Sequence, residues 1–292
     1  MCRLFGFRSV ITSQIHSSLV HAENALGTQS LRHPDGWGVA YYLNNIPHII
    51  KSSERAFDDH IFHRISGVVT SHTVIAHLRK ATQGQINILN SHPFQFGSWV
   101  FAHNGNLKNY HLHLEKLKSH IHPEYLKYIL GTTDSEVIFY LLLSVLKENH
   151  ISDLEKSCPL KLKITIEKWC QLITQYTGPL YGGEDSQPQE NHLTFLLTNG
   201  SSMIAFQGGQ NLHYSTYKNH CPERETCPYF SHSCENGVEQ NQKVNHLIIA
   251  SEKLQGENVW IKMNKGQLIG VGDKMNFFSQ QLEVPFTKEI SS

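Results

Sequence analysis

Several features that would place the chain in a common class are scarce or missing from its 292 residues. No apolar run approaches the length that spans a bilayer, and the N-terminus lacks the apolar stretch of a signal peptide. Only 17% of the residues are charged, 25 basic and 25 acidic, and neither sign forms a block. We therefore expect a cytoplasmic globular protein with no nucleic-acid or membrane partner.

Motifs for bound phosphate are also missing. The chain has no glycine-rich phosphate loop and no G-x-G-x-x-G motif after a predicted strand, and it has no internal repeat. Six cysteines are too few for a disulfide scaffold in a chain of this length, so each must be explained as core, ligand or nucleophile. The twenty histidines are scattered beside polar or loop residues, and we expect most of them at the surface.

Apolar patterns predict strands towards both ends of the chain and two helices between them, an α+β layout. A turn at Asn44-Asn45 predicts a hairpin between the first two strands. The expected strands cover residues 36–43, 47–51, 73–79, 98–103, 193–198, 202–206, 212–217, 246–250, 259–262 and 267–271, and the expected helices begin near residue 134 and cover 160–176. No linker separates a second unit, so we expect one domain over residues 1–292.

Cys2 is notable for its position. A small side chain after Met1 favours removal of Met1, which leaves a thiol and a free α-amine on one residue. An α-amine has a pKa of about 8, so a useful fraction is uncharged at neutral pH and can take the thiol proton directly or through water. Such a residue is nucleophile and base at once. The alternative is that Cys2 simply begins a strand.

Five short motifs follow Cys2 in a fixed order. They are HPDGWG (33–38), HLRKAT (77–82), NSHPF (90–94), AHNG (102–105) and TTDSE (132–136). Together with Met1-Cys2 they resemble the class II glutamine amidotransferases, in particular the stand-alone branch with YafJ-like proteins, an ergothioneine-pathway amidohydrolase and a glutathione-degrading component. The segments around 250–252 and 266–268 also resemble that branch. The resemblance implies a four-layer αββα sandwich of the N-terminal-nucleophile hydrolase type.

The same resemblance implies roles for individual residues. Cys2 is the nucleophile, and Asn104 and Gly105 form the oxyanion hole. Arg79 receives the substrate α-carboxylate with help from Thr82, because a guanidinium is a planar fork that suits a carboxylate.

The remaining roles concern the substrate ammonium group and the loop beside the nucleophile. Asp134 receives the substrate ammonium group, although a plain helix N-cap is its alternative. Asn104-Gly105 has its own alternative, a simple hairpin turn. Residues 35–37 are expected to pack and orient the site.

Two positions depart from the synthase-linked members of the family. Lys80 stands where those enzymes usually carry an aromatic residue, and Gln83 stands where they often have histidine. We expect both side chains at the rim of the pocket, where they bear on the identity of the substrate.

A cysteine-rich stretch lies inside a predicted loop insertion at about 218–244. Cys221, Cys227 and Cys234 lie near two histidines, and Cys and His are zinc ligands. Their spacing does not match the paired C-x₂₋₄-C pattern of common zinc folds, so a reduced loop without metal is our expectation. No cofactor is expected either.

The leading hypothesis is a cysteine-dependent amidase that hydrolyses glutamine or a small γ-glutamyl amide through a thioester on Cys2. One alternative is a non-catalytic glutamine-binding or regulatory module, and another is an ammonia-donating subunit of a larger synthase. A metal-dependent hydrolase built on the cysteine segment lacks the expected ligand set. The expected partner is a small γ-glutamyl substrate, with a separate acceptor or synthase subunit left open.

Overall fold

The structure is a computed structural model that describes residues 1–14, 17–152, 154, 159–183, 187–237 and 240–287. Within these residues the strands form two antiparallel sheets, sheet A with seven strands and sheet B with six. In spatial order, sheet A contains β11 (Ile261–Lys262), β9 (His213–Ser215), β10 (His246–Ala250), β1 (Arg3–Gln14), β4 (Thr70–Leu78), β2 (Trp37–Leu43) and β3 (Ile46–Ser52). Sheet B contains β13 (Phe277–Gln281), β12 (Gln267–Val271), β8 (Met203–Phe206), β7 (His192–Thr198), β6 (Trp99–Asn106) and β5 (Phe94–Phe96).

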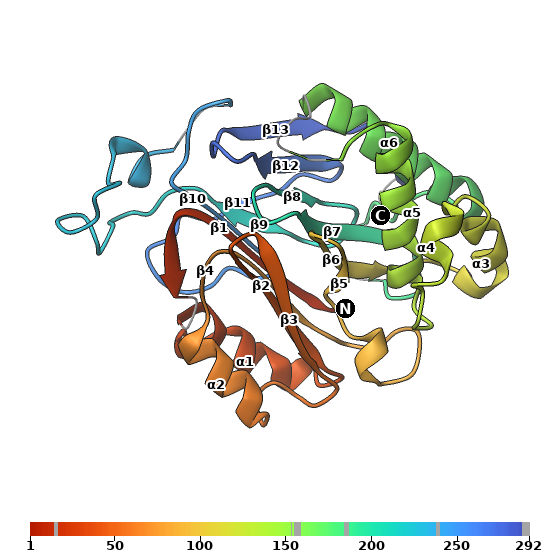
Figure 1. Ribbon diagram of the computed structural model, residues 1–292, viewed down its shortest axis with the longest axis horizontal. Helices are drawn as coiled ribbons and strands as arrows, with labels where there is room; N and C mark the ends of the chain where they lie inside the picture. Colours follow the sequence, from red (N-terminus) through yellow and green to blue (C-terminus); the bar gives the residue numbers. More distant parts are fainter. Residues whose placement is uncertain (15–16, 153, 155–158, 184–186, 238–239, 288–292) are drawn as a thin grey trace.

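Helices cover the outer face of each sheet (Figure 1). On sheet A they are α1 (Leu26–Gln29) and α2 (His60–Val68); on sheet B they are α3 (Tyr110–Lys118), α4 (Pro123–Leu126), α5 (Asp134–Glu148) and α6 (Pro159–Thr177). Short turns of 3₁₀ or π helix lie at Ser17–His21, Ser30–Arg32, Ile88–Asn90 and His232–Cys234. The resulting order of layers is helix, sheet, sheet, helix, which confirms the expected αββα sandwich.

Three apolar cores separate the four layers, because successive strand residues point to opposite faces. In β1, Leu4 packs in the core between the two sheets, whereas Phe5 and Phe7 pack under the helices on sheet A. The third core joins sheet B to α5 and α6 and contains the fully buried Trp169. β1 therefore crosses the centre of the molecule with apolar contacts on both faces, and Cys2 lies directly before it.

The predicted strands are all present, with changes at their ends. The hairpin at Asn44-Asn45 is confirmed: both residues have positive φ (50° and 63°), as a two-residue I′ turn between β2 and β3 requires. The stretch 259–262 shortens to the two residues of β11. The sequence analysis did not identify β13, nor that β1 is a twelve-residue strand at the centre of a sheet.

The expectation that the first hundred residues hold only strands and turns is wrong, because α2 interrupts them. Asp59 caps this helix by accepting a hydrogen bond from the Ile61 N–H, and Phe62 and Ile65 face sheet A. The signal is present in the sequence, an Asp followed by apolar residues at helical spacing, but it covers little more than two turns. A pattern that short does not distinguish a helix from a turn between strands.

Helix α5 is buried on every side rather than along one stripe. All residues from Asp134 to Leu146 are buried, since sheet B lies on one side of the helix and α3 and α6 pack on the others. In the part of the chain that the structure describes, no helix has both the length and the apolar composition needed to cross a bilayer.

Candidate functional site

Cys2 lies directly before β1, beside Leu78 at the C-terminal end of β4. The thiol is 9% exposed, and its Sγ accepts from the Lys80 N–H at 3.4 Å and lies 3.5 Å from the Lys80 carbonyl oxygen. Burial raises the pKa of the thiol, while the Lys80 N–H, the amino terminus and Arg79 act in the opposite direction. The thiol therefore needs a base to become a good nucleophile.

The two sheets bring the other predicted residues to the same end of the sandwich. β4 runs antiparallel to β1 and pairs Leu78 with Arg3, so Arg79 follows directly beside Cys2. A cavity of about 20 Å³ is lined by Cys2, Arg79, Thr82, Gly105 and Asp134, among others. The sixth predicted residue, Asn104, lines an adjoining cavity. The other five predicted residues therefore lie around Cys2.

Arg79 is buried, and its guanidinium holds the loop that follows it. It donates to the carbonyl oxygens of Gln83 (3.0 Å) and Gln85 (3.1 Å). Burial lowers the pKa of the guanidinium, and Cys2 and Asp35 raise it. Arg79 thus points its fork at two carbonyls, the kind of partner that an incoming carboxylate can replace.

Asp134 begins α5 but is not its N-cap, so that alternative is wrong. The cap is Thr133, whose hydroxyl accepts from the Glu136 N–H. The Asp134 carboxylate instead accepts from the Leu107 N–H at 2.7 Å and the Ser135 N–H at 2.7 Å. These bonds fix a buried negative charge at the wall of the Cys2 cavity.

Asn104 and Gly105 lie inside a strand, so the hairpin-turn alternative is wrong as well. β6 continues to Asn106 and pairs Asn104 with Thr194 and Gly105 with Leu193 of β7. The partner strand comes almost ninety residues later in the sequence, so no adjacent run of residues could reveal it. The Asn104 side chain is 1% exposed, and its Oδ1 has no hydrogen-bond partner among the described residues.

Gly105 is required by close packing. A Cβ at this position would lie 2.1 Å from the His192 carbonyl oxygen and 2.2 Å from the His103 ring. Gly36 is constrained in a different way, since its φ is +121° and a Cβ would meet the Ser52 carbonyl oxygen at 2.7 Å. Both glycines allow backbone to come closer to the site than any other residue would.

The loop at 35–37 braces the segment that carries Arg79. The Arg79 N–H donates to the Gly36 carbonyl oxygen at 2.8 Å, and the Asp35 carboxylate accepts from the Ala81 N–H at 2.8 Å. These contacts agree with the expected packing and orienting role of this loop.

Three histidines are buried at the cavity, where His92 and His103 line the wall, and none of the three was predicted as a site residue. The rings of His77 and His92 are 4.2 Å apart, and those of His92 and His103 are 6.5 Å apart. Burial lowers the pKa of His77 to about 3 and the pKa values of His92 and His103 in the same direction, so all three are uncharged at neutral pH. Each belongs to one of the five motifs, which is the signal that could have identified them.

His92 differs from its two neighbours in its hydrogen bonds. His77 and His103 each bond to described atoms, the His103 carbonyl oxygen and the Ser135 hydroxyl respectively. Both ring nitrogens of His92 are buried without a partner among the described residues, and His92 lines the Cys2 cavity. A buried polar group without a hydrogen bond lowers the stability of the fold, so His92 is better explained as part of a binding site than as part of the apolar core.

Lys80 and Gln83, which we expected at the rim of the pocket, both line the small cavity at Cys2 but make different contacts. The Gln83 side-chain amide donates to Asn106 Oδ1 at 2.7 Å and to the Leu107 carbonyl oxygen at 3.0 Å, so it ties its loop to the end of β6. Lys80 is exposed and lines both the small cavity and the adjoining one. Of the two, Lys80 alone reaches the second cavity.

The second cavity has a volume of about 370 Å³. It is lined by Met1, Arg3, Arg32, His33, Lys80, Asn104, Gln210, Asn211, Ser251 and Glu252. Most of these were not predicted as site residues, although Arg3 follows Cys2 directly and Glu252 belongs to the segment at 250–252 noted above. Arg3 and Glu252 come together because β1 and β10 are neighbours in sheet A.

The cysteine segment lies elsewhere. It projects from the sandwich between β9 and β10 (Figure 1), and Cys221, Cys227 and Cys234 carry free thiols that line a separate cavity of about 300 Å³. Cys234 Sγ accepts from the Asn245 side-chain amide at 2.9 Å. Within the described ranges, no group of three or more His, Cys, Asp or Glu side chains is arranged to hold a metal ion.

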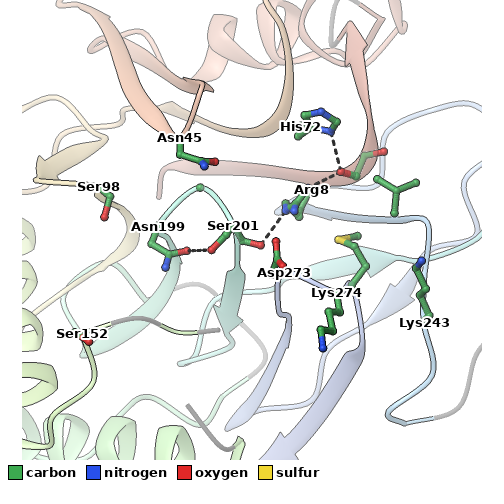
Figure 2. A pocket seen from close by; sticks show the side chains of 14 residues that line it. Arg8, Asn45, His72, Ser98, Ser152, Asn199, Ser201, Lys243, Asp273 and Lys274 are labelled. Atoms are coloured by element: carbon green, nitrogen blue, oxygen red, sulfur yellow. Dashed lines mark hydrogen bonds between the residues drawn. The ribbon is translucent and has the colours of Figure 1, made fainter. Parts of the chain in front are cut away.

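A cavity of about 600 Å³ lies at the other end of the sandwich (Figure 2). Its walls come from the turns between strands, with Asn45, Ser98, Ser201 and Asp273 around the buried Arg8. None of the predicted site residues lines it, and none of the described cysteines does. Size alone therefore does not identify the reactive site.

Comparison with known proteins agrees with the motifs. The sequence matches the family of class II glutamine amidotransferases over residues 1–285. A Haemophilus influenzae protein assigned to the glutamine amidotransferases is 31% identical over 280 residues, which cover 92% of this chain and 83% of that protein. DUG3 of Saccharomyces cerevisiae, also assigned to them, is 32% identical over 224 residues, covering 70% of this chain and 62% of that protein.

Two further likenesses are more limited. The γ-glutamyl-hercynylcysteine sulfoxide hydrolase of Mycobacterium tuberculosis is 31% identical over 115 residues, 36% of this chain and 49% of that protein. The solved structure of a glutamine aminotransferase class-II domain protein from Silicibacter pomeroyi superposes with a TM-score of 0.60 at 18% identity, covering 96% of this chain and 99% of that one. The structural likeness confirms the expected fold.

Proposed function

The chain belongs to the class II glutamine amidotransferases, and from this premise we propose that it hydrolyses a γ-glutamyl amide through a thioester on Cys2. One observation carries the proposal: a thiol, an arginine, a carboxylate and a tightly packed glycine line one small cavity. To bind and react, a glutamyl group needs a nucleophile at its γ-amide and one positive and one negative charge at its α-carbon. Cys2, Arg79 and Asp134 of this cavity could supply all three.

In this proposal the substrate binds with its α-carboxylate on Arg79 and Thr82 and its α-ammonium group on Asp134. The cavity of about 20 Å³ has room for a single water molecule, so the loop after Arg79 must move to admit a glutamyl group. The carboxylate then replaces the carbonyl oxygens of Gln83 and Gln85 on the guanidinium. A charged acceptor forms a stronger hydrogen bond than a neutral carbonyl, which favours the exchange.

The uncharged histidines support this arrangement. If His92 and His103 were protonated, their positive charges would repel the substrate ammonium group and compete for Asp134. Because burial keeps both rings neutral, neither adds a positive charge beside Arg79, Lys80 and Asp134 in the cavity.

The chemistry proceeds in two halves. After Met1 is removed, the Cys2 α-amine takes the thiol proton, and Sγ forms a bond to the γ-carbonyl carbon. The carbonyl oxygen becomes an oxyanion, which the Asn104 amide and the Gly105 N–H stabilise. The C–N bond breaks, the leaving amine takes the proton from the α-ammonium group, and a thioester remains. Water then attacks the thioester, giving glutamate and the free thiol.

We propose a substituted γ-glutamyl amide, rather than glutamine, as the preferred substrate. The 370 Å³ cavity beside Cys2 is far larger than ammonia needs, and the M. tuberculosis relative is named as a hydrolase of a γ-glutamyl compound. A non-catalytic module would have no use for the thiol. An ammonia donor to a separate synthase would instead prefer glutamine, increasingly so with its partner present.

The test is a screen of glutamine, glutathione and other γ-glutamyl compounds with protein whose processing is checked by intact mass. We expect free glutamate from at least one substituted amide, at a higher kcat/KM than from glutamine, and only in protein that has lost Met1. Full activity with Met1 retained, or no glutamate from any compound, would overturn the proposal.

The extent of the catalytic unit is also a proposal. We infer that residues 1–292 act as one amidase unit and that about 218–244 is an insertion in it. The projection of this segment away from both cavities at Cys2 supports the second point (Figure 1). Deleting the projecting part of it, and keeping the buried Val244 at its end, should leave glutamate release intact.

A further inference from the structure

The 370 Å³ cavity beside Cys2 has the size of a small-molecule site. It shares Lys80 with the small cavity but includes neither Arg79 nor Asp134, which are the proposed contacts of the glutamyl group. Asn104 lines this cavity, and Gly105 lines the other, so the proposed oxyanion hole stands between them. The two cavities therefore flank the point where the scissile bond would lie.

The position of Met1 shows which part of the substrate the larger cavity receives. Met1 lines it, so removal of Met1 leaves the α-amine of Cys2 facing this space. The leaving nitrogen takes its proton from that same amine. The departing group must therefore lie on this side of the thiol.

The charges around the cavity are unbalanced. Arg3 forms an ion pair with Glu252, so these two cancel. Arg32 and Lys80 are exposed and form no ion pair with any described residue. His33 adds no charge at neutral pH, because burial lowers its pKa to about 4. Two positive charges therefore remain without a counter-ion among the residues that the structure describes.

We propose that this cavity binds the leaving group and that the leaving group is an amine that carries a carboxylate, held by Arg32 and Lys80. The substrate class is then a γ-glutamyl amino acid, whose α-amine forms the scissile amide and whose carboxylate faces the two cations. This inference rests on the proposed function and adds the charge of the leaving group to it.

Both cations are exposed, so the effect is moderate. An ion pair near solvent changes binding by up to about fivefold, and two such pairs by up to about 25-fold. The attraction also weakens as salt is added, because exposed charges are screened over about 8 Å at physiological ionic strength. The preference for an anionic leaving group should therefore fall with salt.

The experiment compares two substrates that differ only in that charge, γ-glutamyl-glycine and γ-glutamyl-glycinamide, by glutamate release from Met1-processed protein. We expect kcat/KM to be about tenfold higher for γ-glutamyl-glycine at low salt. In the double variant Arg32→Gln, Lys80→Gln this ratio should fall towards one. Arg64→Gln, which removes an exposed cation on α2 away from the cavity, should keep the wild-type ratio.

The outcomes separate the two proposals. If neither compound nor glutamine yields glutamate, the proposed function fails. If both compounds are hydrolysed equally well, or the ratio survives in the double variant with its circular dichroism spectrum unchanged, the function stands and the charged leaving group is wrong. A ratio that falls equally in Arg64→Gln would show a general charge effect, which also overturns the inference.

Discussion

Two buried arginines lie at opposite ends of the sandwich, and their contacts look alike. Arg8 is 8% exposed and Arg79 is 3% exposed, and burial lowers the pKa of each guanidinium. Each donates to two backbone carbonyl oxygens. Burial and bonding alone therefore do not separate an arginine that binds a ligand from one that holds the fold.

The difference is in where the carbonyl groups come from. Arg8 donates to Ser201, in the turn between β7 and β8, 193 residues away and in the other sheet (Figure 2). The carbonyl groups on Arg79 belong to a loop four and six residues further along the chain. The first contact joins the two sheets, whereas the second joins Arg79 to its own loop and can be exchanged while the sheets stay in place. We therefore infer that Arg79 can bind a ligand and that Arg8 stabilises the fold.

The largest effect expected at the reactive end is the loss of Cys2. Cys2→Ala should reduce glutamate release to the background rate, because Cys2 is the one described cysteine that lines the cavity. Cys227→Ser, in the projecting segment, is the matched control and should keep full activity. The measurement is single-turnover formation of glutamate. Appreciable turnover in Cys2→Ala would mean that another nucleophile acts and that the end of the sandwich at Cys2 is not the reactive end.

Asn104→Ala should have the next largest effect, and mainly on turnover. Removing one oxyanion donor lowers kcat by about a hundredfold to a thousandfold, while KM changes much less. Steady-state kinetics with one γ-glutamyl substrate would show this. A rise in KM with kcat unchanged would place Asn104 among the binding groups.

The arginine pair tests the comparison directly. Arg79→Ala removes a charged contact to a part of the substrate that does not react, so KM should rise by about 30- to 300-fold with a smaller change in kcat. Arg8→Met removes the donor of the Ser201 carbonyl oxygen and one of the two contacts of the Ser9 carbonyl oxygen, which also lies 3.3 Å from His72 Nδ1, and it should lower the free energy of unfolding by about 1–3 kcal/mol. Its kinetics at low temperature should match the wild type.

Kinetics and urea unfolding of both variants decide the matter. If Arg8→Met raises KM, or if Arg79→Ala shows the same kinetic pattern as Asn104→Ala, the assignment of one arginine to fold and one to substrate is wrong.

The two ends also show what the sequence could and could not predict. The motifs predicted Cys2, Arg79 and Asp134 for one site, and the structure brings the three to one small cavity, each at the beginning or directly after the end of a long apolar element. They could not show that Asn104 lies in a strand, because its partner β7 is distant in sequence. The second cavity was beyond prediction for a similar reason: Arg3 and Glu252 meet only through the pairing of β1 with β10.

The two ends differ finally in how they respond to acid. His77, His92 and His103 are buried without charge at the reactive end, and burial is the largest cause of their lowered pKa values. Arg8 keeps its charge throughout the range from pH 5 to pH 8, because an arginine does not titrate there. Acid should therefore weaken the reactive end and leave the contribution of Arg8 unchanged.

The test is His92→Leu, which removes one buried histidine and its two unpartnered nitrogens. In the unfolded chain His92 binds a proton as the pH falls through about 6.5. In the folded protein it stays neutral, because burial and the nearby His77, His103, Lys51 and Arg79 oppose a positive charge. Its folded pKa is thus below its unfolded pKa, so its contribution is complete above about pH 6.5 and is lost as the pH falls below that value.

Each such histidine costs the wild type about 1.4 kcal/mol per pH unit below pH 6.5. Urea unfolding at pH 7.5, 6.0 and 5.0 should therefore show His92→Leu gaining on the wild type by about that amount per unit once the pH is below 6.5. Arg8→Met should differ from the wild type by the same amount at all three values, which makes it the control. A His92→Leu profile parallel to the wild type would mean that His92 is protonated in the folded state. Its charge would then face the substrate ammonium group, and the proposal that uncharged histidines line the cavity at Cys2 would be wrong.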